Sequence, residues 1–191
     1  MMRIITGSAK GIPLLTLAGE TTRPTAERTK EAIFSMIQFE VEGMRVLDLF
    51  AGSGQLSLEA LSRGARFATL CDASKEAIEI IRKNAEKTRL KELCDIRLVD
   101  ALAFLKTAPR EKYDLVFLDP PYRLGSIPAA LAALLDGGFL QPHAKLFCES
   151  ASFDDVFQGD DTLAGRFDCL KQTRYGVAHI TLLTPKGDQP T

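Results

Sequence analysis

A buried strand followed by a glycine turn is predicted at Val46-Leu47-Asp48-Leu49-Phe50-Ala51-Gly52-Ser53-Gly54. The small residues after the apolar run lead into a helix expected over residues 55–63. Glycines let a ligand approach the backbone closely, and the first turn of a helix offers unpaired N–H groups. The third glycine of the dinucleotide fingerprint is missing, which disfavours a pyrophosphate ligand. A strand-to-helix turn can also need glycine for purely steric reasons; the alternative is a ligand site where the first strand of an α/β fold ends.

Strand-like and helical patterns alternate from residue 45 onward, which is typical of β-α units around a parallel sheet. We expect strands over residues 45–50, 68–72, 95–99, 114–118 and 145–149, and helices over residues 55–63, 74–88, 101–107 and 127–135. Two further strands, over residues 167–173 and 177–184, flank the turn Arg174-Tyr175-Gly176 and should pair antiparallel. The prediction is an α/β, Rossmann-like fold with a mainly parallel seven-stranded sheet that ends in a C-terminal antiparallel hairpin.

The first 43 residues are expected to form a small extension of a main domain over residues 44–185, with a polar tail over residues 186–191. Within the extension, residues 3–6 and 13–17 can pair as a β-hairpin, and Arg23-Pro24-Thr25 then leads into a helix. One face of that helix is apolar, so we expect the helix to pack on the sheet domain. Its residues are Ala26, Thr29, Ile33, Met36 and Ile37.

The composition is that of an ordinary globular chain: 191 residues, 46% of them hydrophobic and 26% charged. We find no apolar stretch of membrane-spanning length and no signal peptide, so we expect a cytoplasmic protein and no membrane partner. The four cysteines form no C-x-x-C pair and the two histidines lie far apart, so we predict no metal site. A net charge of −1 argues against nonspecific coating of nucleic acid.

Acidic residues stand at the ends of the predicted strands. Asp72 ends the second strand and can accept both hydroxyls of a ribose, and Asp100, followed by Ala101, can accept a hydrogen bond from an adenine amino group. Each of these acids alone can equally be a helix N-cap. Together with Asp48 and Asp119 they mark four strand ends, and ligands of open α/β sheets bind at the carboxyl ends of strands.

The tetrapeptide Asp119-Pro120-Pro121-Tyr122 directly follows the apolar run of residues 115–118. The prolines fix φ and remove two backbone donors, which leaves stiff carbonyl acceptors. A flat amino-bearing ring can lie on Tyr122, with its NH₂ group held by the Asp119 carboxylate and the Pro120 carbonyl. A proline-rich turn, with Asp119 as a local cap and Tyr122 as packing, is the alternative. The pattern favours a site that methylates an amino group.

These motifs together resemble the class I S-adenosylmethionine-dependent amino-methyltransferases. Near the N-terminus, Arg3-Ile4-Ile5-Thr6-Gly7, Lys10-Gly11 and Arg23-Pro24-Thr25 are similar to the opening of the bacterial RsmD family, as is the run of residues 58–65. Members of that family methylate N2 of a guanine in small-subunit ribosomal RNA. The chain departs from the family pattern at Gln55 and Ser57, and it has Asp72 where the family more often has glutamate.

The resemblance implies roles for particular residues. S-adenosylmethionine would be the cofactor and S-adenosylhomocysteine the product; the cofactor-binding residues would be Asp48, Phe50, Gly52, Ser53, Gly54, Asp72, Asp100 and Ala101. Asp119, Pro120, Pro121 and Tyr122 would hold the target guanine and carry the catalysis. Lys10, Arg23, Thr25 and Arg28 are the candidates for contact with RNA, and Lys30 is a further candidate for a phosphate contact. Arg28 and Lys30 can equally be solvated helix charges. The expected partner is ribosomal RNA within an assembled or partly assembled 30S subunit, bound by a monomer.

Other functions share part of this pattern. A DNA adenine-N6 methyltransferase would use the same tetrapeptide, although such enzymes generally need more chain for sequence recognition. Protein-glutamine methyltransferases typically carry asparagine in place of Asp119. A noncatalytic RNA-binding or assembly factor would have no need to keep the tetrapeptide together with all the cofactor acids. A nucleotide-dependent oxidoreductase is disfavoured by the incomplete glycine fingerprint.

Overall fold

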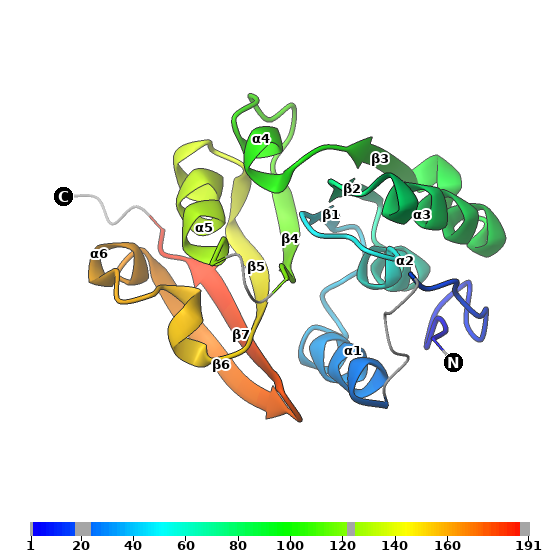
Figure 1. Ribbon diagram of the computed structural model, residues 1–191, viewed down its shortest axis with the longest axis horizontal. Helices are drawn as coiled ribbons and strands as arrows, with labels where there is room; N and C mark the ends of the chain where they lie inside the picture. The colour runs from blue at the N-terminus through cyan, green and yellow to red at the C-terminus, as the bar shows by residue number, and fades with distance from the viewer. Residues whose placement is uncertain (1, 18–23, 122–124, 188–191) are drawn as a thin grey trace.

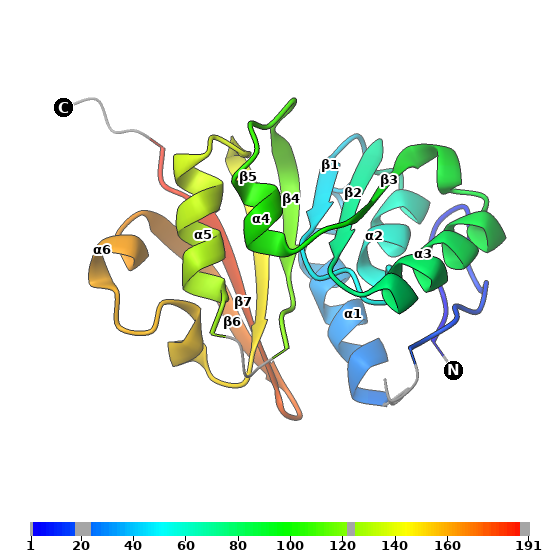
Figure 2. The same cartoon turned by 45° about the horizontal axis from the view of Figure 1, so that its top comes forward.

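The computed structural model describes residues 2–17, 24–121 and 125–187, and the side chains of all of these except residues 24–26. Within them, seven strands form one sheet in the order β3-β2-β1-β4-β5-β7-β6. The strands are β1 (Arg45–Asp48), β2 (Phe67–Asp72), β3 (Cys94–Leu98), β4 (Tyr113–Leu118), β5 (Leu140–Ser150), β6 (Phe167–Tyr175) and β7 (Ala178–Pro185). The first five are parallel, and β7 pairs antiparallel with both β5 and β6. Figure 2 shows the strands side by side, from β6 to β3.

Helices cover both faces of the sheet. They are α1 (Pro24–Met36), α2 (Gln55–Ser62), α3 (Lys75–Thr88), α4 (Ala101–Leu105), α5 (Ile127–Asp136) and α6 (Asp161–Ala164), with 3-10 turns η1 (Lys91–Leu93) and η3 (Phe153–Val156). Figure 1 shows α1 and α2 on one side of the sheet and α5 and α6 on the other.

The side chains of the central strands alternate between two hydrophobic clusters. In β4, Leu115 and Phe117 belong to the cluster that includes the apolar side chains of α1, α2 and α3. Val116 and Leu118 belong to the cluster that includes those of α4, α5 and α6. This is the period of two that a strand buried on both faces requires. The continuous apolar run before Asp119 is therefore explained by helices on both faces of the sheet.

The predicted fold class is confirmed, and the differences are local. β5 begins at Leu140, five residues before the predicted strand, and its register with β4 shifts between the pairs Tyr113–Leu140 and Leu115–Lys145. Pro142 falls in that irregular stretch, where no ladder N–H is required. The short elements α6 and η3 were not predicted from the sequence. Each is a single turn fixed by a side-chain cap, from Asp160 and Ser152 respectively, and so carries no apolar periodicity.

The N-terminal extension forms a looser hairpin than predicted. It contains one antiparallel bridge, between Arg3 and Pro13, in place of two regular strands. The N–H groups of Ile5 and Thr6 donate to the carboxylate of Glu59 on α2, at 2.7 and 3.0 Å, instead of to a second strand. The hairpin keeps a few backbone hydrogen bonds of its own, including those from Ile4 N to the Ile12 carbonyl and from Leu14 N to the Met2 carbonyl, while Ile5 and Thr6 bond to the neighbouring helix.

None of the helices in the described part of the chain combines the length and the apolarity that a membrane span requires. Within the same residues, no three His, Cys, Asp or Glu side chains are grouped so that they could hold a metal ion.

Candidate active site

A cleft of about 480 Å³ opens at the carboxyl ends of β1, β2 and β4. Four aspartates line it: Asp48 ends β1, Asp72 ends β2, Asp100 precedes α4 and Asp119 follows β4. Because β2, β1 and β4 are neighbours in the sheet, their ends meet at one edge. The other lining residues are Leu17, Leu49, Phe50, Ala51, Gly52, Ser53, Gln55, Leu56, Ala73, Ala101, Pro120 and Pro121.

Asp48 is the most buried of the four acids, with 2% of its surface exposed. Ser57 Oγ donates a hydrogen bond to its Oδ2 at 3.0 Å. The pKa of Asp48 is raised to about 7, mainly by burial; hydrogen bonds from Ser57 and the Phe50 backbone oppose this rise, and the charge of the nearby Asp72 adds to it. Because a nearby cation favours the ionised form of a carboxyl group, this site suits a positively charged ligand group.

The glycine turn depends on left-handed backbone angles, with φ of 53° at Gly52 and 77° at Gly54. Gly54 is the residue before α2, and a Cβ on it would lie 3.3 Å from a methyl carbon of Leu70 and 3.4 Å from Ile81. Glycine is required there for both conformation and packing. Gly54 does not line the cleft, so its part in the site is to shape the turn.

Asp72 and Asp100 have structural partners as well as a place in the cleft. Asp72 accepts hydrogen bonds from Gly52 N at 2.9 Å and from Ser74 N at 2.8 Å. Asp100 is the N-cap of α4 and accepts from Ala103 N at 3.0 Å. An ionised carboxylate offers about four lone pairs, so each acid retains acceptor capacity for a ligand. The Asp72 contact also links the ends of β1 and β2 through the glycine turn.

The proline tetrapeptide reaches the same cleft. Asp119, Pro120 and Pro121 all line it, next to the acids expected to hold a cofactor. Asp119 is half-buried and Pro120 is buried. Tyr122, the expected stacking ring, lies outside the described residues.

The lining includes residues that the sequence analysis did not assign to the site. Leu49, Ala51 and Ala73 flank predicted residues, and Gln55 and Leu56 follow the glycine turn in the first turn of α2. These five residues could have been predicted from the sequence because each lies next to, or soon after, a predicted site residue. Leu17 carried no such signal, because it comes from the N-terminal extension and reaches the cleft only through the tertiary fold.

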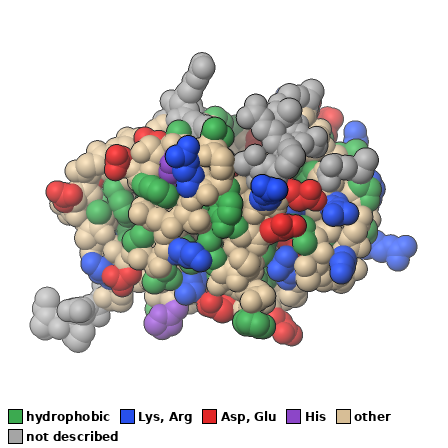
Figure 3. All heavy atoms as spheres, turned by 90° about the horizontal axis from the view of Figure 1, so that it is seen from below, with side chains coloured by type: hydrophobic (Ala, Val, Ile, Leu, Met, Phe, Trp, Pro, Cys, Tyr) green, Lys and Arg blue, Asp and Glu red, His purple; other side chains and the backbone are tan. Residues whose placement is uncertain are grey.

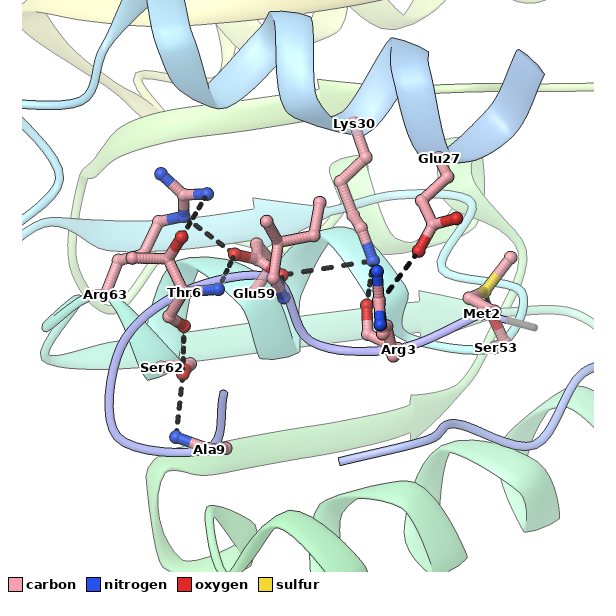
Figure 4. Close-up of polar contacts among 11 residues, drawn as sticks. Met2, Arg3, Thr6, Ala9, Glu27, Lys30, Ser53, Glu59, Ser62 and Arg63 are labelled. Atoms are coloured by element: carbon pink, nitrogen blue, oxygen red, sulfur yellow. Dashed lines mark hydrogen bonds and ion pairs between the residues drawn. The ribbon is translucent and has the colours of Figure 1, made fainter. Parts of the chain in front are cut away.

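The predicted RNA-contact residues differ in their surroundings. Lys10 and Arg28 are exposed, as a phosphate contact requires. Arg23 lies outside the described residues, as does the side chain of Thr25. Lys30 is only 1% exposed, so its expected phosphate contact is wrong. Its Nζ donates to the Arg3 carbonyl at 2.6 Å and lies 3.9 Å from Glu59 Oε2 (Figure 4).

One face of the molecule carries a mixture of positive and negative side chains. On the face shown in Figure 3, Lys and Arg side chains are interspersed with Asp and Glu. This mixed pattern agrees with the net charge of −1. Nucleic-acid binding by bulk positive charge is therefore disfavoured.

The charge of the cleft indicates what it can hold. Among its described lining residues four are aspartates and none is lysine or arginine. An acidic cleft disfavours a dinucleotide with its anionic pyrophosphate, and it fits S-adenosylmethionine, which carries a sulfonium and an ammonium group. Its volume lies in the usual range for small-molecule sites. The fold and the site define a class I, S-adenosylmethionine-dependent methyltransferase.

Comparison with known proteins identifies the family. The family model described as "Conserved hypothetical protein 95" matches residues 2–184, so the chain belongs to that family, and the resemblance to the RsmD family is confirmed.

Individual relatives agree with this assignment. "Putative rRNA methyltransferase YlbH" of Bacillus subtilis is 34% identical over 97% of this chain and 100% of its own length. "Ribosomal RNA small subunit methyltransferase D" of Haemophilus influenzae is 34% identical over 78% of each chain. A solved structure described as "Putative methyltransferase yhhF from Escherichia coli" superposes with a TM-score of 0.84 at 29% identity, over 96% of this chain and 97% of that one.

Proposed function

We propose that the protein transfers a methyl group from S-adenosylmethionine to the exocyclic N2 of one guanine in small-subunit ribosomal RNA. The observation that carries this proposal is a single cleft in which Asp119, Pro120 and Pro121 stand beside Asp48, Asp72 and Asp100. Two of the relatives are named for ribosomal RNA methylation, and one of these names specifies the small subunit.

The cofactor residues have separable roles. Asp48 and the backbone of the glycine turn hold the methionine part, Asp72 accepts the ribose hydroxyls, and Asp100 accepts from the adenine amino group. Phe50 and Ala101 border the cofactor from the ends of β1 and β3. The cofactor, when bound, supplies a methyl group that its sulfonium charge has already activated.

The protein then has to align the target nitrogen rather than create a strong nucleophile. The lone pair of guanine N2 is delocalised into the ring, so hydrogen bonds from its NH₂ group to Asp119 and the Pro120 carbonyl favour a pyramidal nitrogen. The Asp119 carboxylate also stabilises the positive charge that develops on that nitrogen. As the new N–C bond forms, the C–S bond breaks and S-adenosylhomocysteine leaves; the nitrogen then loses a proton to Asp119 or to water. Tyr122 stacks on the base, which requires an unpaired or extruded guanine.

The partner is a preassembled small ribosomal subunit, bound by a monomer in the cytoplasm. Lys10, Arg23, Thr25 and Arg28 of the N-terminal extension contact RNA, while the overall charge of −1 contributes little. Shape and protein contacts on the subunit supply the remaining affinity. The extension over residues 1–43 therefore serves substrate binding, and residues 44–185 carry the chemistry.

The test combines the purified protein, radiolabelled S-adenosylmethionine and small subunits that lack the modification, followed by nucleotide mapping. We expect label on N2 of one guanine. Label on adenine, or none above the background of an Asp119→Ala control, would overturn the proposal. Label on adenine in duplex DNA would instead favour the DNA methyltransferase alternative.

A further inference from the structure

The N-terminal extension reaches the candidate active site through one side chain. Asn84 of α3 is fully buried, and the hydrogen bonds of its side chain go to residues outside its own helix. Its Oδ1 accepts from Leu15 N at 2.8 Å, and its Nδ2 donates to the Leu15 carbonyl at 2.9 Å and to the Ser53 carbonyl at 2.9 Å. One amide group thus joins the extension to the glycine turn.

The contacts with Leu15 occupy both backbone polar groups of that residue, as a neighbouring strand would. Two residues later, Leu17 lines the cleft together with Ser53. On the other side of the same turn, Ser53 Oγ donates to the sulfur of Met2 at 3.6 Å. Leu14 N donates to the Met2 carbonyl at 2.9 Å, so both contacts with the glycine turn belong to one hydrogen-bonded unit.

Residues 5–9 of the extension are fixed to α2, the helix that begins at the glycine turn. Glu59 accepts from Ile5 and Thr6, and Ser62 Oγ accepts from Ala9 N at 2.9 Å and donates to the Thr6 carbonyl at 2.6 Å (Figure 4). A Cβ on Gly7 would lie 1.7 Å from the Ser62 carbonyl oxygen, so the loop and the helix are in the closest contact that glycine permits. The segment that precedes residues 14–17 is therefore held in place against α2.

We propose that Asn84 is a positioning residue of the cofactor site, which holds residues 14–17 against the glycine turn so that Leu17 forms one wall of the cleft. This inference rests on the proposed function, because it takes the cleft to be the cofactor site. It assigns to the N-terminal extension a part in cofactor binding, in addition to its proposed contact with RNA. Without Asn84, both polar groups of Leu15 and the Ser53 carbonyl lose their partner, and Leu17 loses its fixed place.

The test is calorimetric binding of S-adenosylhomocysteine to the full chain, which needs neither RNA nor turnover. We expect Asn84→Ala to weaken binding roughly tenfold and Leu17→Ala roughly threefold. The loss is larger in Asn84→Ala because it displaces Leu17 and also frees the Ser53 carbonyl of the glycine turn. Since Leu17 is already displaced there, the double variant should bind about as weakly as Asn84→Ala alone. With S-adenosylmethionine, Asn84→Ala should raise KM and leave kcat nearly unchanged, as loss of uniform binding does.

The matched control is Thr88→Val on the same helix. Thr88 is buried, and among the residues that the structure describes its Oγ1 donates to the carbonyls of Asn84 and Ala85, both in α3, so this variant perturbs the helix without freeing the extension. We expect its binding to match that of the wild type. Unchanged affinity in Asn84→Ala, or fold losses that multiply in the double variant, would overturn the inference.

Two further outcomes distinguish a failure of this inference from a failure of the proposed function. If Asn84→Ala does not fold, Leu17→Ala alone decides the matter, and binding equal to that of the wild type overturns the proposed wall. If the wild type itself does not bind S-adenosylhomocysteine, the proposed function fails and the inference fails with it.

Discussion

At the scale of single residues, Asp48 makes the stability of the protein depend on pH. Its pKa of about 7 in the folded state lies above the value of about 4 in an unfolded chain. The folded state therefore keeps a proton that the unfolded chain releases, so the stability from Asp48 is fully present below about pH 4 and is lost as pH rises through about 7. Asp48→Asn should remove this loss. Thermal unfolding of the wild type and of Asp48→Asn between about pH 5 and 8 measures this pH dependence. If the stability of both proteins changed with pH in the same way, Asp48 would not be its source.

Asp119 is expected to act on the target base and not on the cofactor. Asp119→Ala should lower kcat about 100-fold, because the acceptor for the guanine NH₂ group and its developing charge is lost. Its affinity for S-adenosylhomocysteine should stay within about threefold of the wild type, measured by calorimetry. Asp100→Ala is the matched control and should show weakened binding. If Asp119→Ala lost cofactor affinity instead, the division of the cleft into two parts would be wrong.

At the scale of elements, Glu59 determines how the extension is attached to α2. It is fully buried, accepts two backbone N–H groups, and pairs with Arg63 at 2.8 Å and with the buried Lys30. Burial lowers the pKa of Lys30, and the Glu59 charge raises it. Because removal of one partner leaves a buried charge unpaired, Glu59→Gln should lower the free energy of unfolding by about 3 kcal/mol in denaturant titrations.

Glu86→Gln provides the control for this prediction. It removes an equivalent charge from an exposed pair with Lys91 at 2.6 Å. Surface pairs contribute little, so we expect unfolding like that of the wild type. Equal effects of the two substitutions would show that the buried network does not hold the extension.

At the scale of the whole molecule, the charge distribution bears on the form of the substrate. A net charge of −1, together with the mixed charges on the face shown in Figure 3, leaves few counterions to be released on binding, so naked RNA should bind weakly. We expect methylation of assembled small subunits to be clearly faster than methylation of the same RNA free in solution. Parallel time courses with radiolabelled cofactor measure the difference. Equal rates on the two substrates would exclude a preassembled particle as the preferred substrate.

The sequence by itself determined the order of the elements and the strand-end acids. The apolar runs, the glycine turn and the tetrapeptide follow from local rules of periodicity, turn geometry and proline stereochemistry, which act over a few residues. These rules placed Asp48, Asp72, Asp100 and Asp119 at strand ends. The parallel sheet then brought them into one cleft, as expected.

Only the tertiary structure decided which polar side chains face solvent and which join distant segments. Lys30 has the sequence context of an exposed helical lysine, yet it is buried because the Arg3 carbonyl and Glu59 meet it from other elements. Asn84 and Leu15 lie 69 residues apart, and no local pattern predicts their pairing. Burial and hydrogen bonding between such segments depend on how the whole chain packs, and for that reason the sequence predicted the four acids of the cleft but not its wall at Leu17.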